Sequence, residues 1–187
     1  MRVISGDRRG MQLKAVPGQS TRPTTDKVKE SIFNMIGPYF DGGMMLDLYG
    51  GSGSIGIEAI SRGMSHAILV DKDKKAIDTI NANVKQARYE DEIDVYRNDS
   101  ERALKAIVKK EHQFALIFLD PPYKNHRLDK ELLFIAENKL LEKNGIIVVE
   151  HAFDEPLQEQ YEELMCIREE RYGDTMISLF EWKEQSE

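Results

Sequence analysis

The sequence has little of what marks secreted, metal-binding or membrane proteins. Its single cysteine, Cys166, excludes an internal disulfide, and its four histidines do not cluster with it as zinc ligands would. No apolar run approaches the roughly 20 residues needed to cross a bilayer, and the first residues lack the apolar stretch of a signal peptide. We therefore expect a cytoplasmic protein without a metal site.

The composition is that of a globular protein, with 41% hydrophobic and 32% charged residues. A length of 187 residues suits one domain. We expect a monomer in which residues 1–40 form a basic extension and residues 41–187 the core. The net charge is −7, but residues 1–30 hold seven Lys or Arg and three acids, which makes that segment net +4. Such a patch can contact phosphates on an acidic protein, although composition alone fits a solvated surface equally well.

The pattern of apolar residues predicts an α/β fold. Two short strands, 2–5 and 11–16, precede a helix from Thr24 or Thr25 to about Ile36. From residue 44 onward strands and helices alternate, which predicts a parallel sheet with helices on both faces. The expected strands are 44–48, 66–70, 93–96, 114–119 and 146–150, the expected helices are 55–62, 74–87, 101–109 and 128–138, and two further strands, 161–171 and 175–182, end the chain.

A glycine-rich loop follows the first strand of this alternating region. Glycines let the backbone turn sharply and let a ligand approach it closely. Gly51, Gly53 and Gly56 also spell G-x-G-x-x-G, and Asp71 follows at dinucleotide-site spacing. However, Asp47 lies at the end of the strand, just before the glycines, where a carboxylate would repel a pyrophosphate but suit a cation. S-adenosylmethionine carries a sulfonium, an ammonium and no phosphate, so it is the ligand that we predict. A nicotinamide-dependent oxidoreductase remains the alternative.

A polar segment, Asn98-Asp99-Ser100, follows the third strand of this region. Its side chains are placed to bond an adenine amino group, with the Ser100 backbone meeting a ring nitrogen. The same residues would also cap the helix that follows. Both roles stay open.

The segment Asp120-Pro121-Pro122-Tyr123 ends an apolar strand. Its two prolines fix the backbone and offer no N–H donor, so the main-chain carbonyls stay available as acceptors. The Asp120 carboxylate and the Pro121 carbonyl can hold both N–H groups of an exocyclic amine and aim its lone pair at a methyl group. Asp120 can take the released proton, and Tyr123 offers a ring on which a base stacks.

These motifs resemble the Rossmann-fold N-methyltransferases that carry (Asp/Asn)-Pro-Pro-(Tyr/Phe), which act on DNA adenine, RNA guanine or protein glutamine. The N-terminal segments RVISG, RRG and TRPTTDKVKESIFN, at residues 2–6, 8–10 and 21–34, narrow the resemblance. They are similar to the bacterial 16S ribosomal RNA (guanine(966)-N2)-methyltransferase family. The resemblance covers the whole chain, including the acid after the fifth strand, Glu150.

The resemblance implies a Rossmann-like class I methyltransferase, with a seven-stranded, mostly parallel sheet whose last strand is antiparallel, plus an N-terminal hairpin and helix. It implies methylation of a guanine in 16S rRNA, as free RNA or in an assembling small subunit. Lys27 and Lys29 stand where the family more often has arginine, so bidentate phosphate contacts are not expected there. The implied cofactor residues are Asp47, Tyr49, Gly50, Gly51, Ser52, Gly53, Asp71, Lys72, Asp99 and Ser100; the implied catalytic residues are Asp120, Pro121, Pro122 and Tyr123; the implied substrate contacts are Arg8, Arg9, Arg22, Thr24 and Thr25.

Three alternatives remain open. The protein could methylate adenine N6 in DNA or a protein glutamine by the same chemistry. The glycines could instead bind the nicotinamide cofactor of an oxidoreductase. The protein could also be a non-catalytic RNA-binding or assembly protein that has inherited this fold. His151, beside Glu150, is a weaker candidate for substrate contact.

Overall fold

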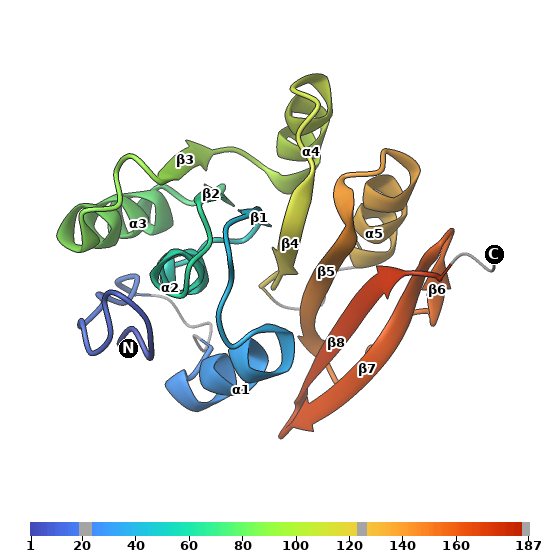
Figure 1. The fold of residues 1–187 in the computed structure, drawn as a ribbon, viewed down its shortest axis with the longest axis horizontal. Helices are drawn as coiled ribbons and strands as arrows, with labels where there is room; N and C mark the ends of the chain where they lie inside the picture. Colours follow the sequence, from blue (N-terminus) through green and yellow to red (C-terminus); the bar gives the residue numbers. More distant parts are fainter. Residues whose placement is uncertain (19–23, 123–126, 185–187) are drawn as a thin grey trace.

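The structure is a computed structural model that describes residues 1–18, 24–122 and 127–184. Within these ranges, eight strands form one sheet in the order β3-β2-β1-β4-β5-β8-β7-β6 (Figure 1). Strands β1 to β5 are parallel, and β8 pairs with β5 in the antiparallel sense. The strands are β1 (Met44–Asp47), β2 (His66–Asp71), β3 (Ile93–Arg97), β4 (Phe114–Leu119), β5 (Leu141–Ala152), β6 (Gln160–Tyr161), β7 (Leu164–Tyr172) and β8 (Thr175–Trp182).

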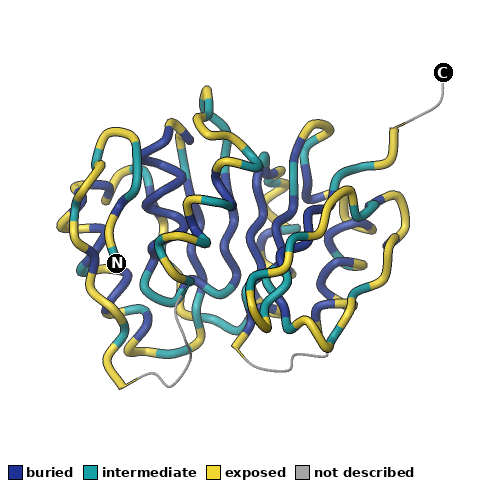
Figure 2. Tube along the Cα trace, turned by 90° about the horizontal axis from the view of Figure 1, so that it is seen from below, coloured by how far each residue is buried: buried dark blue, intermediate teal, exposed yellow. Residues whose placement is uncertain are grey.

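Helices cover both faces of the sheet. One apolar cluster contains buried residues of α1, α2 and α3, and a second contains those of α4 and α5. Figure 2 shows the buried segments running through the middle of the molecule, between exposed loops. The helices are α1 (Asp26–Ile36), α2 (Ser54–Ser61), α3 (Lys74–Ala87), α4 (Ser100–Lys109) and α5 (Leu128–Glu137). None of the helices in the described ranges has the length and hydropathy to span a membrane.

Local sequence explains where these elements begin. The side chains of Thr25, Asp73 and Asp99 accept hydrogen bonds from backbone N–H groups and cap α1, α3 and α4. The central strands are continuous apolar runs, as expected where helices cover both faces of a parallel sheet. The predicted order of strands and helices is thus confirmed, and its boundaries shift by only a few residues.

The strand order reverses next to β1, and this creates the crevice in which open α/β sheets bind ligands. Strand β1 lies between β2 and β4, with Asp47 beside Phe118 in the register. The loop after β1 leads to α2 on one face, whereas the chain after β4 leads to α5 on the other. The residues after β1, β2, β4 and β5 therefore meet at one edge.

The prediction of two N-terminal strands, 2–5 and 11–16, is wrong in its extent. The two segments meet in one isolated bridge, Arg2–Gln12, joined by a turn with positive φ at Gly6 and Gly10. The reason is that their outer N–H groups bond to side chains of the core. Ile4 N–H donates to Glu58 Oε1 (2.8 Å) and Lys14 N–H to Asn83 Oδ1 (2.9 Å).

The expected count of seven strands is also corrected, because the predicted strand 161–171 is split. Glu162 adopts a left-handed conformation (φ 52°) and forms a turn, so that Gln160–Tyr161 pairs back on the start of β7. The described chain therefore has an eighth, two-residue edge strand, while the predicted antiparallel closing of the sheet is confirmed.

Candidate active site

The loop after β1 is shaped by its glycines. Gly51 (φ 58°) and Gly53 (φ 84°) both adopt conformations that side chains other than glycine rarely take. Gly50 N–H donates to the Val70 carbonyl (2.7 Å), which fastens the loop to the end of β2. Gly53 is the N-cap residue of α2, so the helix N-terminus faces the same crevice.

Asp71, at the end of β2, holds this loop in place. Its Oδ2 accepts from Gly51 N–H and its Oδ1 from Asp73 N–H, both at 2.9 Å. Each carboxylate oxygen has more than one lone pair, so both can still accept from the two hydroxyls of a ribose. The next residue, Lys72, is exposed, and its carbonyl accepts from Arg97.

Asp47 is a buried acid at the floor of the crevice, with 1% of its surface exposed. Burial raises its pKa to about 7, and the nearby carboxylates Asp71 and Glu150 act in the same direction; the Tyr49 N–H, which donates to Asp47 Oδ1 at 3.0 Å, acts against them. Three carboxyl groups therefore gather at this edge of the sheet. Such a group of acids suits a cationic ligand and disfavours a pyrophosphate.

A buried hydroxyl–carboxyl cluster lies behind the predicted adenine site. Ser100 Oγ donates to Glu131 Oε1 (3.0 Å), and the Tyr49 hydroxyl bonds to both Glu131 and Ser100. Asp99 caps α4, and its bond from Arg102 N–H, the largest contribution, lowers its pKa. The cap role of Asp99 is confirmed. Glu131, which joins the loops after β1 and β3 to α5, was missed because nothing in the pattern distinguishes it from a surface helix acid.

Asp120 follows β4 and faces two residues distant in the sequence. Thr24 Oγ1 lies 3.3 Å from Asp120 Oδ2 and 2.8 Å from Glu150 Oε2. The Thr24 hydroxyl thus lies between the two carboxyls. Burial, then the neighbouring Glu150, then the charge of Asp47 raise the pKa of Asp120 well above its ordinary value. Asp120 therefore lies at the crevice that begins after Asp47, as the sequence predicts.

The structure describes some of the remaining predicted site residues and not others. Pro121 is buried and Pro122 exposed. Tyr123 and Arg22 lie outside the described residues. The Thr24 hydroxyl reaches Asp120 and Glu150, whereas Thr25 is the N-cap of α1.

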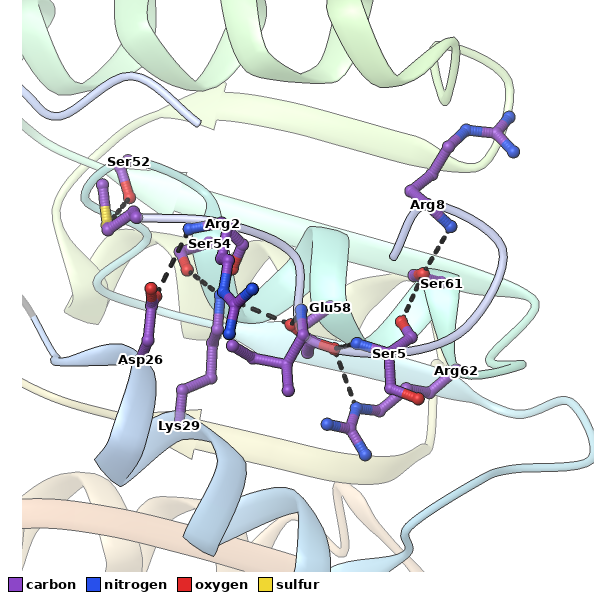
Figure 3. Close-up of polar contacts among 12 residues, drawn as sticks. Arg2, Ser5, Arg8, Asp26, Lys29, Ser52, Ser54, Glu58, Ser61 and Arg62 are labelled. Carbon is purple, nitrogen blue, oxygen red and sulfur yellow. Dashed lines mark hydrogen bonds and ion pairs between the residues drawn. The ribbon is translucent and has the colours of Figure 1, made fainter. Parts of the chain in front are cut away.

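The basic extension is not a uniform phosphate-binding surface. Arg9 is exposed, but the Arg8 guanidinium donates to the Ala87 carbonyl (2.7 Å) and stacks on the Tyr89 ring. Figure 3 shows the Arg8 backbone nitrogen bonded to Ser61. Arg8 thus fastens the extension to the core. Lys29, counted with the basic residues above, is fully buried.

Glu58 of α2 is the anchor of this extension (Figure 3). It is fully buried and forms ion pairs with Lys29 (3.3 Å) and Arg62 (2.8 Å), and it also accepts from the N–H groups of Ile4 and Ser5. Lys29 in turn donates to the Arg2 carbonyl and to Ser54 Oγ, and burial lowers its pKa. This network fixes α1, and with it the segment that carries Thr24.

The weaker candidate His151 makes hydrogen bonds within the fold and does not face the site. It is buried, its Nε2 bonds to Ser178 Oγ (2.7 Å), and its Nδ1 lies within hydrogen-bond distance of the Glu155 carbonyl. These contacts join β5 to β8. The residue that reaches the site from this strand is its neighbour Glu150.

Comparison with known proteins identifies the family. A family model described as "Conserved hypothetical protein 95" matches residues 1–181. The chain belongs to this family. One relative, "Putative rRNA methyltransferase YlbH" of Bacillus subtilis, is 56% identical over 180 residues, covering 96% of this chain and 98% of the relative. Another, "Ribosomal RNA small subunit methyltransferase D" of Haemophilus influenzae, is 34% identical over 84% of this chain and 81% of its own length.

A similar solved structure has the same architecture. "Putative methyltransferase yhhF from Escherichia coli" superposes with a TM-score of 0.84 at 25% identity, covering 99% of each chain. The predicted Rossmann-like class I methyltransferase fold is confirmed, as is the predicted family.

Proposed function

We propose that this protein transfers a methyl group from S-adenosylmethionine to the exocyclic N2 amine of a guanine in 16S rRNA, the guanine numbered 966 in the family's name. The observation that carries the proposal is the corner at Asp120 and Pro121, which lies at the same edge of the sheet as the buried acid Asp47. Relatives named as small-subunit rRNA methyltransferases support RNA as the substrate.

The residues of the crevice fit this cofactor. Asp47 supplies a buried negative charge for the cation, and the backbone of residues 50–53 approaches the ligand closely because it is largely glycine. Asp71 offers free lone pairs to the ribose. We place Tyr49, Ser52, Lys72, Asp99 and Ser100 around the methionine and adenine ends. When bound, the cofactor supplies an electrophilic methyl group.

The chain's own residues prepare the amine. The N2 lone pair of guanine is delocalised into the ring, so the amine is a poor nucleophile. Asp120 and the Pro121 carbonyl accept hydrogen bonds from its two N–H groups and turn the lone pair toward the methyl group. These hydrogen bonds stabilise the transition state, because they strengthen as the nitrogen becomes tetrahedral. Tyr123 stacks on the base, at about 1–3 kcal/mol. The exposed Arg9, together with Arg22, contacts RNA phosphates.

The test is methylation of small-subunit rRNA, free and in partly assembled particles, with the modified nucleoside identified by mass spectrometry. We expect N2-methylguanosine from the wild-type protein and its loss in Asp120→Ala with cofactor binding retained. Methylated adenine or methylglutamine instead would move the substrate to one of the alternatives. Preferential binding of NAD in calorimetry would refute the cofactor assignment, and a fully active Asp120→Ala would refute the mechanism.

A further inference from the structure

The proposed methyl transfer leaves one acid of the site without a role. Glu150 is half-buried on β5, just past the last residue that pairs with β4. Its Oε2 accepts from the Thr24 hydroxyl at 2.8 Å, and the same hydroxyl lies 3.3 Å from Asp120 Oδ2. A carboxylate has two oxygens with several lone pairs. A single hydrogen bond from Thr24 therefore leaves Glu150 able to accept further hydrogen bonds from a ligand.

The sheet brings Asp120 and Glu150 side by side. They follow Leu119 and Val149, which pair in the register of β4 and β5, and neighbouring strands lie about 4.8 Å apart. Alternate residues of a strand point to the same face of the sheet. The residues two positions earlier on each strand pack in the apolar cluster that also contains α1. Both acids therefore continue the face that α1 covers, which is where Thr24 meets them.

We propose that Glu150 selects guanine by accepting a hydrogen bond from N1–H of the target base. The inference rests on the proposed function and deepens it. The edge of guanine that carries the amine has three N–H donors, two on N2 and one on the adjacent ring nitrogen N1. The site offers three acceptors at one corner, namely Asp120, the Pro121 carbonyl and Glu150. The amine thus keeps the two partners that methyl transfer requires, and the third acceptor reads the ring.

Adenine and glutamine do not fit this set of acceptors. In adenine, the ring nitrogen next to the amine has a lone pair and no hydrogen, so it would face the lone pairs of Glu150 with no proton between them. A glutamine amide has only two N–H groups and offers no third donor. A polar group that loses water and gains no partner weakens binding. Glu150 therefore disfavours both alternative substrates.

Thr24 holds the Glu150 carboxylate in this position. Its hydroxyl donates to one oxygen of Glu150, which restricts the rotation of a side chain that is otherwise partly exposed. The segment that carries Thr24 is fixed in turn, because the buried ion pair of Lys29 with Glu58 joins α1 to α2. Thr24 acts on the base through Glu150 and is a positioning residue, whereas Glu150 contacts the base itself.

The test uses a base that keeps the amine and lacks the N1 hydrogen. 2-Aminopurine carries the same exocyclic amine at C2, but its N1 has a lone pair in place of the N–H. Small-subunit rRNA is ligated from two pieces with guanine or 2-aminopurine at the target position, in the form, free or partly assembled, that the wild-type protein methylates. Because the two amines differ in reactivity, the quantity compared between proteins is the ratio of kcat/KM for guanine to kcat/KM for 2-aminopurine.

We expect Glu150→Gln to lower this ratio by about 10–100-fold, the contribution of one hydrogen bond to a charged group. The glutamine amide N–H can donate to the N1 lone pair of 2-aminopurine, so the variant loses more rate on guanine than on the analogue. Thr24→Val lowers the ratio in the same direction, and Thr24→Ser, which keeps the hydroxyl, retains it. Glu142→Gln, half-buried at the far end of the same strand, is the matched control and keeps the wild-type ratio. S-adenosylmethionine affinity, measured by calorimetry, stays unchanged in all four variants and shows that they are folded.

The outcomes separate the two proposals. If the wild-type protein makes no N2-methylguanosine from the RNA that contains guanine, the proposed function fails and this inference with it. If the wild type is active but Glu150→Gln loses rate equally on both bases, Glu150 has a structural role and the inference alone is wrong. Weaker S-adenosylmethionine binding in Glu150→Gln, with the ratio unchanged, would assign Glu150 to the cofactor and overturn the inference as well.

Discussion

Replacing Asp47 by asparagine should stabilise the free protein while weakening its cofactor site. Asp47 is buried next to Asp71 and Glu150, and burial raises its pKa from 3.8 to about 7. An ionised carboxylate in this position costs folding free energy that a neutral amide does not. The asparagine keeps the oxygen that accepts from Tyr49 N–H, so the turn after β1 is preserved.

The magnitude follows from linkage between protonation and folding. A pKa of about 7 in the folded state against 3.8 in the unfolded state corresponds to about 4 kcal/mol of folding free energy. Because the folded pKa is the higher one, the folded protein holds a proton that the unfolded chain has lost. This favourable contribution is present below pH 3.8 and is lost as pH rises to about 7.

The assay is urea denaturation of both proteins without cofactor, over a pH series that spans this window. The unfolding free energy of Asp47→Asn minus that of wild type should increase with pH up to about 7 and then level off, by as much as about 4 kcal/mol. Calorimetry at neutral pH should show weaker binding of S-adenosylmethionine to the variant. Denaturation free energies that differ by a constant across the series would show that Asp47 does not have a raised pKa, and the predicted stabilisation would be wrong.

Three further predictions concern the loop, the anchor and the extension. Asp71→Ala should weaken S-adenosylmethionine binding by roughly 10–100-fold, because one or two hydrogen bonds to a charged group are lost. Turnover at saturating cofactor should be largely kept. Calorimetry and initial rates test this, and an equal loss of turnover would contradict the role of Asp71 in binding the ribose. Glu58→Gln should destabilise the protein by about 3–5 kcal/mol, because Lys29 and Arg62 lose their buried anion; a thermal denaturation curve that does not shift would disprove this. Gly6→Ala places a Cβ 1.8 Å from the Ser61 carbonyl oxygen, whereas a Cβ at Gly10, with a similar φ, meets nothing within 4 Å. Limited proteolysis should therefore release the N-terminus faster in Gly6→Ala than in Gly10→Ala. Equal rates of release would show that the clash does not loosen the N-terminus.

The order of strands and helices was predictable because the pattern that defines it is local. Apolar runs such as Phe114–Leu119 and caps such as Asp73 determine their elements without reference to distant residues. Motifs at the ends of these strands then predict one site, since parallel strands end at one edge. Asp47, Asp71 and Asp120 were found in this way.

Residues whose roles depend on long-range contacts were not predictable. Glu58 reads as an ordinary helix acid until Ile4 and Lys29 lie against it, and Arg8 reads as a phosphate contact until Tyr89 covers it. The split of the strand expected at 161–171 depends on a left-handed Glu162, a conformation for which the sequence gives no glycine or asparagine signal.

The contact between Thr24 and Glu150 spans 126 positions of the chain. During synthesis the hydroxyl emerges early, and it has no carboxyl pair to meet until the fifth strand has been made and inserted. A growing chain therefore carries its glycine loop well before Thr24 can meet both carboxyls. Methyl transfer should consequently depend on the order of the segment before α1 as well as on that of the sheet, and a loss of order in that segment would stop the reaction before the sheet unfolds.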